Sequence, residues 1–252
     1  MFTEPPPRPL LIRPTAPEAD WRRFDPLIGI CFLIGSLTLM VLLLGILVVF
    51  VDFTGTAKDF VAAAITIGFE VLFGLGVLVL ARRRGISLKA LGFRRPDRWG
   101  PLGIAVVGAY ATLFAYGIGI TLLRQVGVDT TTFDQGNEIP IDEDSGTLLL
   151  VGLLVVFGFA VVVVAPMAEE LFFRGLLFRS LDGRWGTWLA IAASGFAFGA
   201  FHVSLSVLLP FTVIGMIFAW AFKASGSLWV TILAHFIFNS VALILTVIGI
   251  FY

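Results

Sequence analysis

Long apolar runs are the feature of this sequence that most limits its fold. They recur along nearly the whole chain, and each approaches the roughly 20 residues that an α-helix needs to cross a bilayer. We predict about seven spans, at residues 27–51, 60–81, 101–123, 147–166 with an extension, 187–203, 207–222 and 228–250. Hydrophobic residues make up 58% of the chain, which lies outside the range of soluble domains. The predicted fold class is therefore all-α, a polytopic transmembrane helical bundle.

Charged residues between the apolar runs predict the orientation of the bundle. Lysine and arginine concentrate in residues 1–26 and 82–98, whereas residues 125–146 are acidic and contain no basic residue. Because basic loops remain on the cytoplasmic side, we expect a cytoplasmic N-terminus and an outer C-terminus. Binding of lipid headgroups is the alternative role for the basic loops. Residues 1–26 are rich in proline and predict an extended, mobile tail, followed by one transmembrane domain at residues 27–252.

Several other classes of function find no support in the composition. The formal net charge is zero, so no electrostatic feature predicts binding to nucleic acid. The single cysteine, Cys31, cannot form an intramolecular disulfide. Because no organelle-targeting signal is evident, we expect a prokaryotic plasma membrane protein. The sequence does not predict its oligomeric state.

Ionisable side chains inside apolar segments are costly to bury, so each is a candidate functional residue. They occur at few positions: Glu70, Glu169, Glu170, Arg174, His202 and His235. The two histidines are the only ones in the chain, and both fall in predicted spans. Glu70 stands apart from the others in the sequence, and we expect it to be structural or to form a polar wall of the same cavity.

Residue spacing separates the roles of neighbouring polar side chains. Glu170 and Arg174 are four residues apart on a helix, in the order that favours an ion pair. Glu169 points about 100° away from Glu170 and therefore faces a different neighbour. His235 and Asn239 are also four residues apart and share one face of the last span.

Depth in the membrane predicts that these groups meet. A polar turn at residues 182–186 lies about sixteen residues from both Glu169 and His202, or roughly 24 Å in a helical hairpin, so the two lie level. His235 reaches the same layer if that hairpin extends about 10 Å further into the cytoplasm. Gly195 and Gly199 form a small-xxx-small surface that presents His202 at a close helix crossing. Alternatively, each polar residue makes only a helix-packing hydrogen bond.

Three ordered motifs resemble the CPBP family of intramembrane proteases. The motifs are Glu169-Glu170-x-x-x-Arg174, Phe198-x-x-x-His202 and His235-x-x-x-Asn239, each on a hydrophobic segment. The family includes the CAAX prenyl endopeptidase of the Ras-converting type, together with members linked to bacteriocin immunity and abortive infection. The resemblance covers about residues 148–245, which would form the catalytic core.

The resemblance implies an endopeptidase that cleaves near the C-terminus of a membrane-associated or lipidated protein. Glu169 would act as general base on water and His202 would hold that water, while His235 and Asn239 would donate hydrogen bonds to the oxyanion. Glu170, Arg174 and Phe198 would support these groups.

The sequence is compatible with catalysis both with and without a metal ion. Glu169, His202 and His235 could supply the three ligands of a catalytic zinc, with water in the fourth position. However, the chain has no HExxH helix, and an asparagine suits an oxyanion site better than a zinc site. We therefore favour a mechanism without a metal cofactor.

Two other function classes are compatible with the same residues. A non-catalytic scaffold or bacteriocin-immunity protein would need the Glu170–Arg174 pair but not His235. A proton-coupled transporter would use Glu70, Glu169 and the histidines as a relay, although the sequence shows no inverted repeat of the kind that transporters have.

Overall fold

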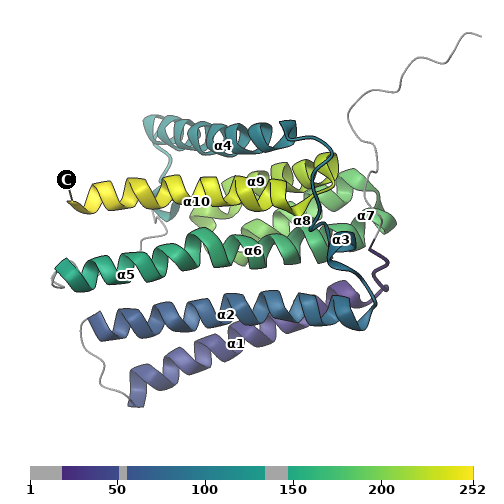
Figure 1. Ribbon diagram of the computed structural model, residues 1–252. Coiled ribbons are helices and arrows are strands. Elements are labelled where there is room, and N and C mark those ends of the chain that lie inside the picture. Colours follow the sequence, from purple (N-terminus) through teal and green to yellow (C-terminus); the bar gives the residue numbers. More distant parts are fainter. Residues whose placement is uncertain (1–18, 51–55, 134–146, 252) are drawn as a thin grey trace, which may run out of the picture.

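Long helices lying side by side make up the whole fold (Figure 1). The computed structural model describes residues 19–50, 56–133 and 147–251, and no β-strand occurs in these ranges. In chain order the main helices are α1 (Asp25–Phe50), α2 (Thr56–Arg83), α4 (Gly100–Gln125), α5 (Thr147–Phe159), α6 (Ala165–Glu170), α7 (Arg179–Trp185), α8 (Thr187–Phe201), α9 (Leu205–Ser225) and α10 (Leu228–Phe251). Short elements are α3 (Leu88–Leu91), the 3₁₀ turn η1 (Thr131–Phe133), and the π-helical segments η2 (Ala160–Val164) and η3 (Leu171–Phe178).

The lengths of the helices confirm an all-α bundle that spans the membrane. In the described ranges, six helices are long and apolar enough to cross a bilayer. The fourth of these runs without interruption from Val151 to Trp185, a length of 35 residues that joins α5 to α7. The remaining predicted span, the fifth at residues 187–203, corresponds to α8, which has only 15 residues. At 1.5 Å per residue α8 is about 22 Å long, so its C-terminal end lies inside the bundle.

Two boundaries differ from the sequence-based prediction. The predicted turn at residues 182–186 is helical up to Trp185, and the chain bends only at Gly186, whose φ of 80° suits glycine. Asp182 stays in the helix because its carboxylate accepts hydrogen bonds from Thr187 Oγ1 and Lys223 Nζ. His202 does not lie within the fifth span as predicted, but is the C-cap residue of α8.

Polar contacts gather the basic residues at one end of the bundle. Asp25 at the start of α1 forms an ion pair with Arg84, with an Nη2–Oδ1 distance of 2.6 Å. Arg184 donates to the carbonyl oxygen of Trp21, and the Trp21 indole donates to Gly175 O at 2.9 Å. Because Trp21 is buried, the predicted mobile tail ends before residue 26. Residues 1–18 lie outside the described ranges.

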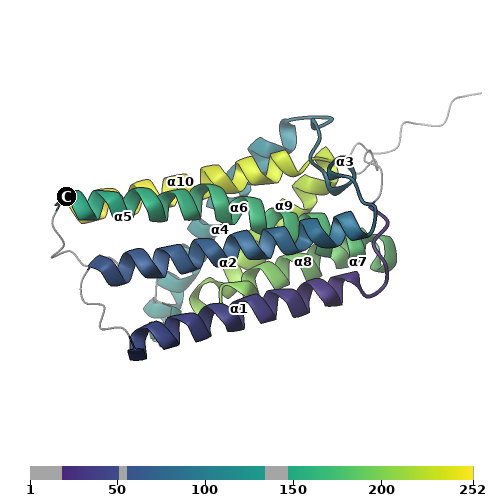
Figure 2. The ribbon, with the colours of Figure 1, turned by 60° about the horizontal axis from the view of Figure 1, so that its bottom comes forward.

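The central layer of the bundle is the α6–η3 stretch, which Figure 2 shows among the other helices. Every residue of η3 is buried. By contrast, only 6% of the residues in the most apolar part of α1 are buried, and the share in α4 is the same. The side chains of these two helices therefore face outward. α1 packs on α2, and α4 packs on α9 and α10. The motif from Glu169 to Arg174 therefore falls on a strongly buried stretch of the bundle.

The tightest helix crossing joins α8 to α9, as the small-residue pattern predicted. A Cβ atom added to Gly195 would lie 2.7 Å from Thr212 O, and one added to Gly199 would lie 2.6 Å from Leu208 O. Both contacts are with backbone atoms, so only glycine lets the helices approach this closely. This crossing holds the C-terminal end of α8, and with it His202, against α9.

Candidate active site

One cavity of about 390 Å³ contains all four residues predicted to be catalytic. Its walls are formed by α2, the continuous α5–η2–α6 stretch, α8, α9 and α10. Its polar lining includes Glu70, Glu169, His202, His235 and Asn239, and the other lining residues are largely apolar. Side chains from opposite ends of the sequence therefore meet in one enclosed, mainly apolar space.

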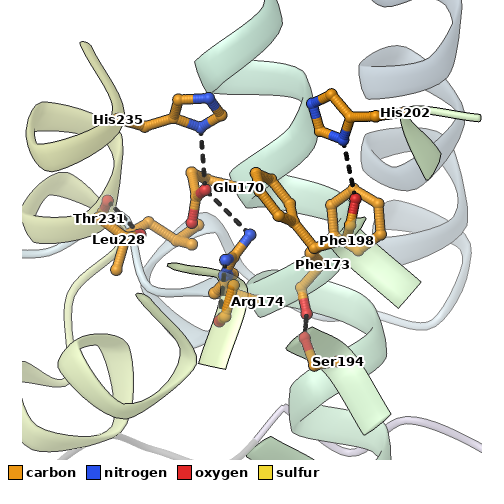
Figure 3. Close-up of polar contacts among 10 residues, drawn as sticks. Glu170, Phe173, Arg174, Ser194, Phe198, His202, Leu228, Thr231 and His235 are labelled. Atoms are coloured by element: carbon orange, nitrogen blue, oxygen red, sulfur yellow. Dashed lines mark hydrogen bonds and ion pairs between the residues drawn. The ribbon is translucent and has the colours of Figure 1, made fainter. Parts of the chain in front are cut away.

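Glu170 lies beside this cavity and joins two partners that the sequence places far apart (Figure 3). Arg174 Nη1 lies 3.0 Å from Glu170 Oε1, which confirms the predicted ion pair. His235 Nδ1 lies 3.1 Å from the same oxygen, a contact that the sequence did not predict. All three side chains are at least 95% buried. A buried carboxylate with two such partners is a rigid connection between η3 and α10.

Arg174 has further neighbours that suit a buried guanidinium, while its Nε has no hydrogen-bond partner among the described residues. Its Nη2 donates to Gly215 O at 3.1 Å. Its Cζ lies 4.7 Å from the ring centroid of Phe198 and 5.5 Å from the ring centroid of Phe218. The positive charge therefore lies over both aromatic rings. Phe198, predicted as a supporting residue, therefore packs against both the arginine and the cavity.

Hydrogen bonds at Nδ1 determine which nitrogen each histidine leaves free. His202 Nδ1 lies 2.9 Å from Phe198 O (Figure 3). A carbonyl oxygen can only accept, so Nδ1 carries the proton, and in the neutral ring Nε2 is an acceptor. His235 Nδ1 likewise faces the carboxylate of Glu170. The nitrogens left for water or substrate are thus the two Nε2 atoms.

Asn239 has a structural contact in addition to its place in the cavity wall. Its Nδ2 donates to Val161 O at 2.7 Å. In η2, Ala165 N–H bonds to Ala160 O, and Pro166 has no N–H, so Val161 O lacks both backbone donors that a helix would provide. Asn239 supplies the missing donor with one of the two N–H groups of its side-chain amide. The second N–H is available to other partners. Pro166 was the sequence signal that could have indicated this need.

Two carboxyl groups face the cavity without a complete set of partners. Glu169 is 5% exposed and Glu70 is 6% exposed. In the described part of the chain, Oε2 of each has no hydrogen-bond partner. An unpartnered buried carboxylate oxygen is costly, so both groups are available to water or substrate.

The donor set does not form a ready metal site. Within the described ranges, no three His, Cys, Asp or Glu side chains are grouped closely enough to hold a metal ion. Glu169, His202 and His235 line one cavity but do not converge on one point as zinc ligands would.

Comparisons with known proteins agree with the position of this site. Residues 151–241 match the family model described as "Type II CAAX prenyl endopeptidase Rce1-like". The "Putative membrane peptidase YdiL" of Bacillus subtilis (strain 168) is 32% identical over 83 residues, which cover 33% of this chain and 34% of that protein. The match thus spans about a third of that relative's length. No solved structure matches this chain. The family match begins in α5, ends in α10 and contains all three motifs.

Proposed function

We propose that this integral membrane protein, which belongs to the CPBP family of intramembrane proteases, hydrolyses a peptide bond by means of water activated by Glu169. The observation that carries the proposal is the enclosed cavity in which Glu169, His202 and His235 meet. A bundle that needed these groups only for packing would pair them with one another, whereas Glu169 Oε2 has no partner in the described ranges.

Glu169 acts as the general base in this proposal. A water molecule in the cavity donates one hydrogen bond to the carboxylate of Glu169 and one to Nε2 of His202, because both are acceptors. Proton transfer to Glu169 then generates the nucleophile that attacks the scissile carbonyl carbon. Phe198 O holds the His202 ring in the required tautomer.

His235 stabilises the oxyanion in the next step. With Nδ1 directed to Glu170, its Nε2 can donate only when the ring is an imidazolium. The carboxylate of Glu170 lies 3.1 Å from Nδ1 and also pairs with Arg174, so it faces the positive charge that the imidazolium would carry. The remaining N–H of Asn239 is a second donor to the oxyanion.

The proposed substrate is a membrane-associated or lipidated protein, cleaved near its C-terminus. The name of the matching family refers to prenyl endopeptidases, and the walls of this cavity are rich in phenylalanine. Such walls suit an apolar segment or a lipid-modified chain end. The proposed location is a prokaryotic plasma membrane, in keeping with the bacterial source of the relative.

Cleavage of a peptide library by the detergent-purified protein tests the proposal. Glu169→Gln preserves the size and polarity of the side chain, so we expect normal folding and a loss of cleavage of about 100-fold or more. Asp97→Asn is the matched control, because this carboxylate pairs with Arg94 at the basic end of the bundle, and we expect it to retain full activity. Equal rates for Glu169→Gln and the unmodified protein would overturn the proposal.

A non-catalytic scaffold is the second candidate function. The contacts of His235 with Glu170 and of Asn239 with Val161 favour it, because both give catalytic candidates a structural role. Substitution of His235 therefore cannot separate the two functions, since it would disturb either one. A scaffold would tolerate Glu169→Gln in an assay of its binding or immunity function.

A further inference from the structure

Glu70 lies outside the segment that matches the family, yet it shares the cavity with the candidate catalytic residues. It belongs to α2, whereas the match covers residues 151–241. Its side chain is 6% exposed, and Oε2 has no hydrogen-bond partner in the described ranges. A carboxyl group that lines the catalytic cavity with an unpartnered oxygen is a candidate for a chemical role.

The packing of α2 against α6 explains how Glu70 reaches the site. The two helices run side by side in the same direction (Figures 1 and 2). A Cβ atom added to Gly74 would lie 3.3 Å from Cβ of Ala168, so the two backbones approach closely here. Glu70 is one helical turn before Gly74 and Glu169 is next to Ala168, and both side chains line the same cavity.

The electrostatics of the cavity determine the charge on this carboxyl pair. The lining residues include no lysine or arginine. Arg174 is the nearest buried cation to Glu169 in sequence, and it is already paired with Glu170. Two negative charges in one apolar space repel each other, which favours a state in which the pair shares one charge and one proton. One carboxyl group is then a base and the other is an acid.

We propose that Glu70 is the general acid that protonates the leaving amine, an inference that rests on the proposed peptidase function. Water attacks the carbonyl carbon while one of its protons passes to Glu169. As the tetrahedral intermediate collapses, the C–N bond breaks, the amine nitrogen takes the proton of Glu70, and the other product leaves as a carboxylic acid. The proton on Glu169 then passes to Glu70 and restores both groups. No oxidant, reductant or further reactant is required.

Two substrates with the same acyl group test this role. A peptide amide needs a proton on its leaving nitrogen, whereas an aryl ester releases a phenolate that needs none. We expect Glu70→Gln to lower the rate of amide cleavage about 100-fold or more and to change ester cleavage by less than about threefold. Glu169→Gln is expected to lower both rates, because the base is needed for either substrate.

Thr112→Val is the control, since Thr112 lies on α4 and is not part of the cavity lining. Thr112 Oγ1 donates to Gly108 O within its own helix, and we expect both rates to be retained. If Glu70→Gln does not fold, the pair Glu70→Asp and Glu70→Asn gives the same comparison, with amide cleavage greater in the aspartate variant.

The outcomes separate this inference from the function on which it rests. An unchanged ratio of amide to ester rates in Glu70→Gln would overturn the role of Glu70 and leave the peptidase function intact. Equal loss of both rates would also overturn it, because it would show a structural role or a role in water activation. If the unmodified protein cleaves neither substrate, the proposed function itself fails.

Discussion

At the scale of single residues, the adjacent carboxylates Glu169 and Glu170 have different environments. Glu170 Oε1 contacts both Arg174 and His235, whereas Glu169 lines the cavity. The angle between neighbouring residues on a helix is the cause, because about 100° of rotation directs one side chain to the bundle interior and the next to the cavity. One carboxylate therefore organises the site and the other is free for chemistry.

Loss of Arg174 alone should destabilise the protein strongly. Arg174→Met leaves Glu170 as a buried charge with only His235 beside it, which we expect to cost about 3–5 kcal/mol in the free energy of unfolding. Thermal unfolding in detergent measures the change. The double variant Glu170→Gln/Arg174→Met removes both charges and should recover part of the loss. A double variant less stable than Arg174→Met would contradict this account.

Metal removal should leave peptide cleavage unchanged. Because no three ligand-type side chains are grouped in the described ranges, we expect full activity after dialysis against EDTA or 1,10-phenanthroline. Cleavage of the same peptide before and after dialysis is the measurement. Loss of activity that returns on addition of Zn²⁺ would instead support coordination by Glu169, His202 and His235.

At the scale of elements, the helix that carries Glu169 depends on a side chain from α10. The π-helical segment η2 and the imino acid Pro166 leave Val161 O without backbone donors, and Asn239 supplies one at 2.7 Å. Val161 lies eight residues before Glu169, so this contact fixes α10 to the same helical stretch about two turns before Glu169.

A double-variant cycle tests this dependence. Asn239→Leu removes the donor to Val161 O and should cost about 1–3 kcal/mol in the free energy of unfolding. Pro166→Ala restores a backbone N–H that can bond to Val161 O, so the loss should be smaller when both substitutions are combined. Thermal unfolding of the four proteins measures the coupling. Additive effects would show that Pro166 and Asn239 act independently.

The α8–α9 crossing should be equally sensitive to side-chain size. Gly199→Ala places a methyl group 2.6 Å from Leu208 O, so the helices must separate and His202 must move. We expect lower stability and a loss of cleavage. Gly117→Ala in α4 is the matched control, because nothing lies within 4 Å of the added atom, and we expect no loss of stability. Equal behaviour of both variants, judged by unfolding and cleavage, would contradict the close-packing account.

At the scale of the whole molecule, the arrangement of charge and helix ends agrees with the predicted orientation. The contacts Asp25–Arg84 and Lys223–Asp182 join the start of α1, the end of α2, α7 and the end of α9 at one end. The C-terminus of α10 lies at the opposite end (Figure 1). The basic residues thus gather on the side that the distribution of lysine and arginine predicts to be cytoplasmic.

Labelling of introduced cysteines checks this orientation. In a Cys31→Ser background, Arg95→Cys lies at the basic end and Val128→Cys at the opposite end, and both positions are exposed. We expect a membrane-impermeant maleimide to label Val128→Cys in intact cells and to label Arg95→Cys only after the cells are opened. The reverse pattern would invert the orientation and place the basic end outside.

What the sequence by itself determined is local. Apolar runs predict helices and their approximate ends, because length and hydrophobicity decide whether a segment can cross a bilayer. Spacing within one helix predicts the Glu170–Arg174 pair and the close crossing at Gly195 and Gly199, because helical geometry is the same in every protein. Order and residue type in three motifs were enough to indicate the family.

Only the tertiary structure decided which distant groups meet. The contact of His235 with Glu170, the contact of Asn239 with Val161 and the entry of Glu70 into the cavity each join separate helices. The rotation of each helix about its own axis decides such contacts. That rotation results from the packing of all neighbouring helices at once, so it cannot be predicted from a short stretch of sequence.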